Sequence, residues 1–224
     1  MISVLGTVSA ASVGGGAVLA GRWATRRFDE LGRPRDFPVW SVSLLAVLAV
    51  LAVIPGVRRH SEETRLSRVA TVLVGHKVQV KCQSFGQALS DVGAELGYVK
   101  WTDSGDPEAK TLIKRDPCAA LRHYYGGDRA HPSRDEIIAV HVLTHEAMHM
   151  RGQLSESMAE CEAVQRDEQT ASLLGATPAQ ARMLARDYWG TVYPEMPDDY
   201  RSSDCAPGLT LDEHLDTAPW LAVS

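Results

Sequence analysis

Two histidines separated by three residues, with a glutamate directly after the first, stand in the run His145-Glu146-Ala147-Met148-His149. Side chains four residues apart on an α-helix point to the same side, so both imidazoles can meet one metal ion. Glu146 lies about 100° around the helix from His145, close enough to accept a proton from a water molecule on that ion. The run therefore predicts a metal centre with an adjacent general base.

The residues around this run predict the helix that must carry it. Ser133 stands three residues before Glu136, which is the spacing of a capping box at a helix start. Gly152 is a suitable residue for the helix end. We therefore expect a helix from Ser133 to about Arg151. The apolar residues of its buried face are expected to be Ile137, Ile138, Val140, Val142 and Leu143.

A second helix is expected directly afterwards, with Ser155 as its cap. If the two helices lie antiparallel, Glu156 faces His149 and Glu160 faces His145, because facing residues have numbers with a constant sum. A catalytic zinc ion needs three protein ligands and an open position for water, so Glu156 is the predicted third ligand. Glu160 is expected to accept a hydrogen bond from the other ring nitrogen of His145, and it remains the alternative third ligand.

These two helices resemble the HExxH plus ExxAD pattern of gluzincin-type zinc metallopeptidases. The resemblance implies that His145, His149 and Glu156 bind Zn²⁺, that Glu146 is the general base and acid, and that Glu160 is the carboxylate behind the ligands. It covers only this part of the chain. Glu160 replaces the usual aspartate, and the seven-residue step from His149 to Glu156 is shorter than in most gluzincins.

The activity that the resemblance implies is hydrolysis of a peptide or protein substrate by a zinc-activated water molecule. Gluzincins also supply a His or Tyr that stabilises the developing oxyanion. The alternative function is a membrane-tethered binding or scaffold protein in which zinc is structural or absent. The downstream candidates for the oxyanion donor are Tyr188, Tyr193, Tyr200 and His214.

Residues 1–57 contain two uncharged apolar blocks and are expected to anchor the chain in a lipid bilayer. Block 37–57 is long enough to cross a hydrocarbon layer of about 30 Å. Block 1–21 is interrupted by glycines and is a weaker candidate. Arginines in the connection 22–36 favour a cytoplasmic position for it, which leaves residues 58–224 outside. The margin is small, because four arginines also follow the second block: Arg58, Arg59, Arg65 and Arg68.

The cysteines give a second indication of compartment. All four follow the apolar blocks, and their even number fits two disulfides in an oxidising compartment, with three pairings possible. The net charge of −5 argues against a cationic face for nucleic acid. We therefore expect an extracytoplasmic catalytic domain held at the cell membrane.

The remaining patterns predict the fold class. β-Branched residues favour a strand over Val69–Cys82, and a hairpin is expected from Gly97–Trp101 and Lys110–Lys114. Thr177 followed by Pro178 predicts the start of another helix. The chain is thus predicted to be α+β, with N-terminal transmembrane helices followed by a mainly helical, zincin-like domain with a small β-sheet.

Overall fold

The computed structural model divides the chain into two compact units, Met1–Ser61 and Glu62–Ser224, which are described separately. The first unit contains the predicted membrane anchor, and the second contains the predicted metal ligands. The residues that the structure describes are 4–25, 28, 32–33, 36–88, 93 and 95–220.

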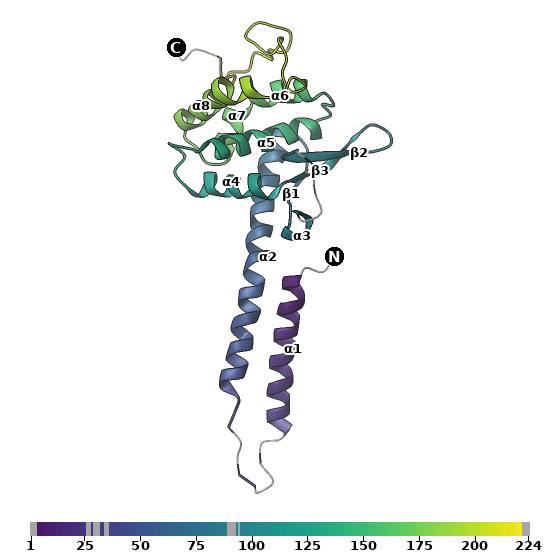
Figure 1. The fold of residues 1–224 in the computed structure, drawn as a ribbon, viewed down its shortest axis with the longest axis vertical. Coiled ribbons are helices and arrows are strands. Elements are labelled where there is room, and N and C mark those ends of the chain that lie inside the picture. Colours follow the sequence, from purple (N-terminus) through teal and green to yellow (C-terminus); the bar gives the residue numbers. More distant parts are fainter. Residues whose placement is uncertain are drawn as a thin grey trace. The chain divides into compact units, whose positions relative to one another are not determined.

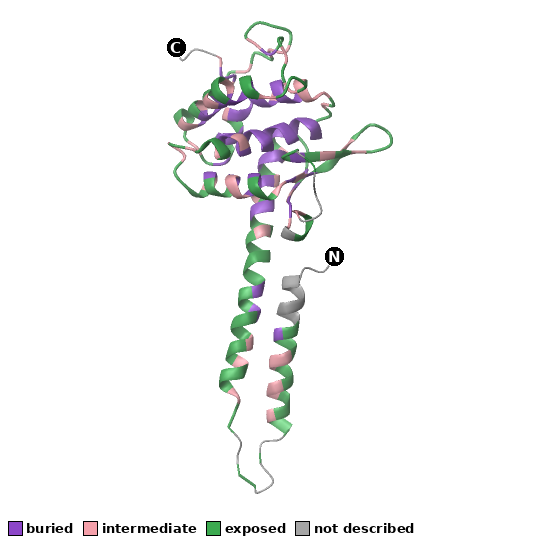
Figure 2. Cartoon of the chain, in the orientation of Figure 1, coloured by how far each residue is buried: buried purple, intermediate pink, exposed green. Residues whose placement is uncertain are grey.

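The first unit contains helix α1 (Val4–Thr25) and the N-terminal part of helix α2 (Val39–Val74) (Figure 1). Helix α2 is long and apolar enough to cross a membrane by its length and composition. Most of its side chains in this unit are exposed (Figure 2). Part of the predicted connection 22–36 lies outside the described residues.

Helix α2 includes most of the predicted span 37–57 and continues to Val74. The strand predicted over Val69–Cys82 was therefore wrong for residues 69–74, and only Gln79–Cys82 forms strand β1. β-Branched residues occur in both strands and helices, but here the buried apolar residues recur every three to four positions, which is the spacing of a helix. The residues at helical spacing that this part of α2 buries in the core are Leu66, Val69, Ala70 and Leu73.

The second unit has a three-stranded sheet in the order β1-β3-β2. Strands β2 (Gly97–Trp101) and β3 (Pro107–Ile113) form the predicted antiparallel hairpin, and β1 pairs with β3 in parallel. Strand β2 therefore lies at the edge of the sheet, and it pairs with β3 along only one of its two sides.

Helices make up most of the second unit, which confirms an α+β fold that is mainly helical with a small sheet. A one-turn π-helix and a short 3-10 helix follow the last α-helix, over Tyr188–Val192 and Tyr193–Glu195. The α-helices after α2 are α3 (Phe85–Ala88), α4 (Arg115–Gly126), α5 (Arg134–Met150), α6 (Glu156–Val164), α7 (Asp167–Leu173) and α8 (Pro178–Asp187).

Helix α5 is the centre of the second unit. It contacts α4, α6, α7 and both strands of the hairpin, and nearly all its residues are buried (Figures 1 and 2). The predicted capping box is present, since the Ser133 side chain accepts from Glu136 N and the Glu136 side chain accepts from Ser133 N. The buried helix gives its side chains fixed positions, which a metal site requires.

The helix predicted after Ser155 is interrupted and forms α6 and α7. The break falls at Gln165 and Arg166, whose side chains bind the irregular C-terminal segment. Gln165 Nε2 donates to Leu211 O at 2.9 Å, and Arg166 pairs with Glu213 through both of its terminal nitrogens. These contacts hold segment 196–220, which has no helix or strand among its residues.

The four cysteines form two disulfides, as the sequence predicted. Cys82–Cys118 joins β1 to α4, and Cys161–Cys205 joins α6 to the C-terminal segment. Disulfides of this kind persist in oxidising compartments, so they favour an extracytoplasmic position for the second unit.

Candidate metal centre

Three donor atoms converge where α5 meets α6. His145 and His149 lie one turn apart on α5, and their Nε2 atoms are 3.0 Å apart. Oε2 of Glu156, in the first turn of α6, lies 3.1 Å from His145 Nε2 and 3.3 Å from His149 Nε2. Ligand atoms bound at about 2.0–2.1 Å to a tetrahedral zinc ion are about 3.3 Å apart. The donor set and its spacing therefore fit Zn²⁺.

A tight connection between the two helices creates this arrangement. Gly152 adopts a φ of 111°, which favours glycine, and it reverses the chain directly after α5. The turn brings the first residue of α6, Glu156, beside His149, and it brings Glu160 beside His145, 3.0 Å from Nδ1. The structure thus brings together the predicted donors His145, His149 and Glu156 with the alternative ligand Glu160.

The second nitrogen of each histidine ring also lies close to an oxygen atom, although Nδ1 of His145 is not aligned for a hydrogen bond. His149 Nδ1 lies 2.6 Å from Gln153 O, and His145 Nδ1 lies 3.0 Å from Glu160 Oε2. A neutral ring that donates from Nδ1 presents a lone pair at Nε2. Two such lone pairs and a carboxylate oxygen repel one another unless a cation lies between them. Metal-binding histidines have this arrangement, with one nitrogen toward the ion and the other toward an acceptor.

The same donors also bind a proton strongly. Burial disfavours the charged form of His145, but its contacts with Glu156 and Glu160 outweigh burial and raise the pKa of the imidazole to about 9. The hydrogen bonds from His145 and His149 lower the pKa of Glu156 to about 2. A proton and a metal ion therefore compete for this cluster, and metal binding must release the proton.

Glu146 lies beside the donor cluster, with its side chain between α5 and the sheet. Its Oε2 accepts a hydrogen bond from Thr111 Oγ1 at 2.9 Å, and burial raises the pKa of its carboxyl. Strand β2 passes so close that a Cβ on Gly97 would lie 2.7 Å from Glu146 Oε1. A raised pKa suits a group that must first accept and then return a proton. Sequence patterns gave no signal for either Thr111 or Gly97.

A buried polar network lies behind His145. Glu160 Oε2 is 2.9 Å from His141 Nε2, while Glu160 Oε1 accepts from the Tyr188 hydroxyl at 2.6 Å. His141 Nδ1 in turn lies 2.8 Å from Asp167 Oδ2. Burial opposes the charge of Glu160, but His141 outweighs it and holds the pKa of the carboxyl below its usual range. Asp167 was not singled out in the sequence.

This network bears on the alternative third ligand. Because His141, His145 and Glu160 also lie within metal-binding distance of one another, they form a second possible donor group. That group uses Nδ1 of His145, whereas Glu156 and His149 face Nε2. Glu160 therefore lies on the wrong side of His145 to share an ion with His149, and its position fits the role of the carboxylate behind the ligand.

The donor cluster opens into a cleft of about 720 Å³. The cleft is bounded by α5, by β2 and by the segment that follows α8, and His145, Glu146, His149 and Glu156 all line it. A ligand in the cleft can therefore reach the metal position and the Glu146 carboxylate together. The cluster is not enclosed on all sides by protein, which a purely structural zinc site would be.

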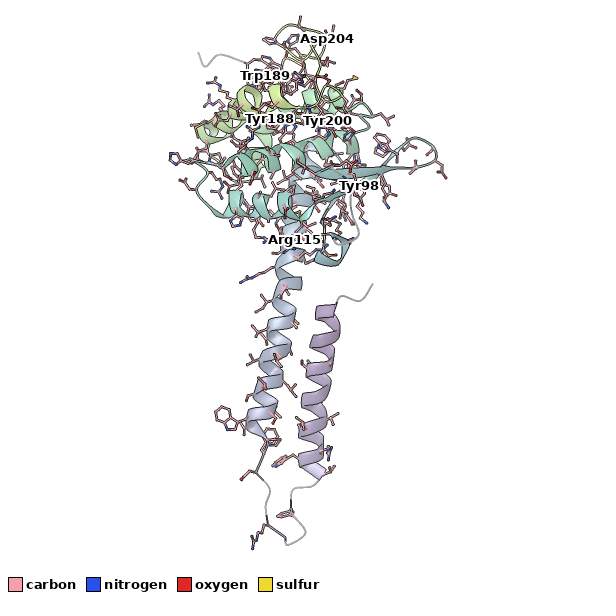
Figure 3. All side chains as sticks on the ribbon, viewed as in Figure 1. Tyr98, Arg115, Tyr188, Trp189, Tyr200 and Asp204 are labelled. Carbon is pink, nitrogen blue, oxygen red and sulfur yellow. A yellow bond between two sulfur atoms is a disulfide. The ribbon has the colours of Figure 1, made fainter. Side chains whose placement is uncertain are left out.

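The four candidate oxyanion donors lie in different surroundings. Tyr188 and Tyr200 both lie near α5 (Figure 3), but the Tyr188 hydroxyl is bound to Glu160. The Tyr193 hydroxyl is hydrogen-bonded to Ser202. The Tyr200 ring lines the cleft with its centroid 5.7 Å from that of the His145 ring. The fourth candidate, His214, is largely exposed and lies 3.2 Å from Asp212. Tyr200 is thus the candidate beside the metal position.

Comparison with known protein families, with curated proteins and with solved structures gives no match for this chain. The comparisons therefore assign it to no family and suggest no activity. Support for a function comes from the residues of the site and their geometry.

Proposed function

We propose that this chain is a membrane-anchored zinc metallopeptidase that hydrolyses peptide bonds. One observation carries the proposal: Nε2 of His145, Nε2 of His149 and Oε2 of Glu156 converge at the wall of an open cleft, beside the buried carboxylate of Glu146. Three protein ligands with an open side are typical of catalytic zinc, and a carboxylate next to them is typical of a general base.

In the proposed reaction, Glu146, Thr111 and Tyr200 have different roles. Zinc, when bound, lowers the pKa of a water molecule and polarises the substrate carbonyl. Glu146 accepts the proton of that water and returns it to the leaving amine, while Thr111 holds one oxygen of the carboxylate in place. Burial raises the pKa of Tyr200 to about 12, so its hydroxyl keeps its proton and is available as a donor to the developing oxyanion.

The edge strand supports a peptide as the substrate. Strand β2 pairs with β3 on one side only, and residues along it, including Gly97, Tyr98 and Val99, line the cleft. An extended peptide can add to such an edge through main-chain hydrogen bonds. A peptide bound in this way would pass the metal position and Glu146.

The position of the chain in the cell follows from its two units. Helix α2 has the length and composition of a membrane span, and the two disulfides favour an oxidising compartment. We propose that the second unit acts on peptides or proteins outside the cytoplasm. The lipid bilayer keeps the site near the membrane surface.

Substitution of the proposed base tests the activity. The full chain, purified in detergent and loaded with zinc, is incubated with a randomised fluorogenic peptide library, beside its Glu146→Gln variant. We expect unchanged zinc content and a loss of hydrolysis by roughly 10²- to 10⁴-fold. Glu168→Gln, on α7 and outside the cleft lining, is the matched control. Stoichiometric zinc without any hydrolysis in the wild type would instead favour a binding or scaffold protein.

A further inference from the structure

We propose that His141 is a positioning residue for the metal centre: it holds the Glu160 carboxylate against the Nδ1 side of the His145 ring, where Glu160 Oε2 lies 3.0 Å from Nδ1. The inference rests on the proposed zinc site and extends it by one layer of residues. His141 contacts Glu160 directly, and its ring centroid lies 6.0 Å from that of His145, so we expect it to act mainly through Glu160.

Both ring nitrogens of His141 face carboxylate oxygens. Nδ1 lies 2.8 Å from Asp167 Oδ2, and Nε2 lies 2.9 Å from Glu160 Oε2. A carboxylate only accepts hydrogen bonds, so satisfying both contacts requires the ring to donate from both nitrogens. This is the imidazolium form, which places one positive charge between two negative ones. Its pKa agrees, since burial opposes the charge but Asp167 and Glu160 raise the pKa of His141 to about 10.

The three charged groups are among the most buried of the second unit. The exposed fraction is 3% for His141, 1% for Glu160 and 0% for Asp167. A buried charge is tolerated only when it is paired and hydrogen-bonded, and removing one partner leaves the other uncompensated. His141 is therefore the group that pairs with both buried carboxylates in this interior.

Two further contacts fix the carboxylate against rotation. Glu160 Oε1 accepts from the Tyr188 hydroxyl at 2.6 Å, so Oε2 is left facing both His141 and His145. The Tyr188 ring is also stacked on the His141 ring, with centroids 3.7 Å apart and planes 11° apart. This stacking holds the imidazolium in the plane that its two carboxylate partners require. His141 and Tyr188 together determine which oxygen of Glu160 meets His145.

Loss of this orientation has a defined consequence at the ligand. An acceptor at Nδ1 fixes the tautomer and the ring orientation of a metal-binding histidine and makes its other nitrogen more basic. Without His141, Glu160 Oε2 loses the contact that fixes it on that side, and the carboxylate is expected to turn away from Nδ1 of His145. The Nε2 lone pair of His145 is then no longer fixed toward Glu156 and His149.

The test is the zinc affinity of the metal-free full chain in detergent, measured by competition with a chromophoric chelator. We expect His141→Gln to bind zinc about 10- to 100-fold more weakly than the wild type, the usual loss for an outer partner of a ligand. Thr170→Val is the matched control, because Thr170 is equally buried between α5 and α7 and bonds only to Thr144 in this interface. The control is expected to lower the melting temperature and leave zinc affinity unchanged.

A double variant asks whether His141 acts through Glu160. In the Glu160→Gln background there is no charged carboxylate to orient, so adding His141→Gln is expected to change zinc affinity no further. A residue that only fills space would weaken both backgrounds alike. If His141→Gln does not fold, Tyr188→Phe serves in its place, because it keeps the stacked ring and removes only the hydrogen bond to Glu160. The expected loss for Tyr188→Phe is a few-fold, again absent when Glu160 is Gln.

Three results would overturn the inference. Wild-type zinc affinity in both His141→Gln and Tyr188→Phe would show that the orientation of Glu160 is immaterial. A further loss on adding His141→Gln to Glu160→Gln would show that His141 acts by another route. Zinc lost completely in His141→Gln but retained in Glu156→Ala would make His141 a ligand. No zinc in the wild type itself would instead refute the proposed function, on which the inference rests.

Discussion

The two sides of the His145 ring differ in almost every respect. On the Nε2 side, the Glu156 side chain is 42% exposed and the cleft is open. On the Nδ1 side, Glu160 is 1% exposed and is bound by two further side chains, those of His141 and Tyr188. The open side leaves room for a ligand to arrive, and the closed side leaves no freedom to the ring. The contrast supports the proposal that the buried side of the ring orients the metal-binding nitrogen on the open side.

Removal of the shared ring should have the largest effect on this arrangement. His145→Ala deletes a donor from the open side and the partner of Glu160 from the closed side. We expect no stoichiometric zinc and no hydrolysis, by elemental analysis of the purified chain and by the peptide assay. His131→Ala, a largely exposed histidine before α5, is the control and should keep both. Full zinc content in His145→Ala would exclude the site.

Glu156 and Glu160 of α6 lie on different sides of the His145 ring, so substituting each one tests one side. Glu156→Gln replaces a charged ligand, so its loss of zinc affinity should exceed the roughly 10- to 100-fold loss expected for Glu160→Gln. Chelator competition measures both. Glu162→Gln, on the same helix, should bind zinc as the wild type does. The reverse order, with Glu160→Gln the weaker binder, would make Glu160 the third ligand.

The pH dependence of zinc binding tests whether a proton and zinc compete for His145. In the metal-free protein the pKa of His145 is raised from 6.5 to about 9, so a proton competes with zinc throughout this range. We expect zinc affinity to rise by up to about 10-fold per pH unit until pH 9. An ordinary histidine would give a plateau above about pH 7, and such a plateau in chelator competition would contradict the prediction.

The same pKa shifts set the stability of the metal-free protein. The folded-state pKa of His145 is raised, so its contribution is complete below pH 6.5 and is lost as the pH rises through about 9. The pKa of Glu156 is lowered to about 2, so its contribution is complete above pH 4.5 and is lost on acidification. Thermal melts without metal should therefore show a maximum between about pH 4.5 and 6.5 from this pair.

Thr111→Val should have the smallest effect, since it removes no metal donor and changes only the hydroxyl contacts to Glu146 Oε2 and to Tyr98 O. A hydrogen bond to a charged group contributes about 1.5–3 kcal/mol, or about 10- to 150-fold in rate. Because the Thr111 hydroxyl has one proton and also contacts Tyr98 O at 3.0 Å, we expect the lower end, a fall in kcat of about 10-fold with zinc affinity unchanged. Steady-state kinetics on a peptide found in the library assay would measure this. The exposed Thr102→Val, in the hairpin turn, is the control. A change in KM alone would place Thr111 in substrate binding instead.

The sequence predicted the parts of the fold that depend on local spacing. The capping box of Ser133 determined the start of α5, and the presence of two disulfides followed from the cysteine count. The antiparallel pairing of two helices was sufficient to place Glu156 near His149 and Glu160 near His145. These relations depend on helix geometry, which a single sequence expresses directly.

Other features depend on contacts distant in sequence and could not be predicted. Asp167 reaches His141 only because the helix breaks at Gln165 and Arg166, which turn toward the C-terminal segment. Tyr200 lies in an irregular segment whose course no periodicity describes. The run from Val69 to Val74 fits a strand as well as a helix by residue type, and its burial in the core determined the outcome.

The Cys161–Cys205 bond links the helix that carries Glu156 and Glu160 to the tail that carries Tyr200. That tail has no helix or strand to hold its backbone in place. The disulfide at Cys205, five residues after Tyr200, restrains the tail instead. We expect a strong reductant to loosen one wall of the cleft while α5 and α6 stay paired. Substrate capture and metal retention would then be separable by thiol chemistry.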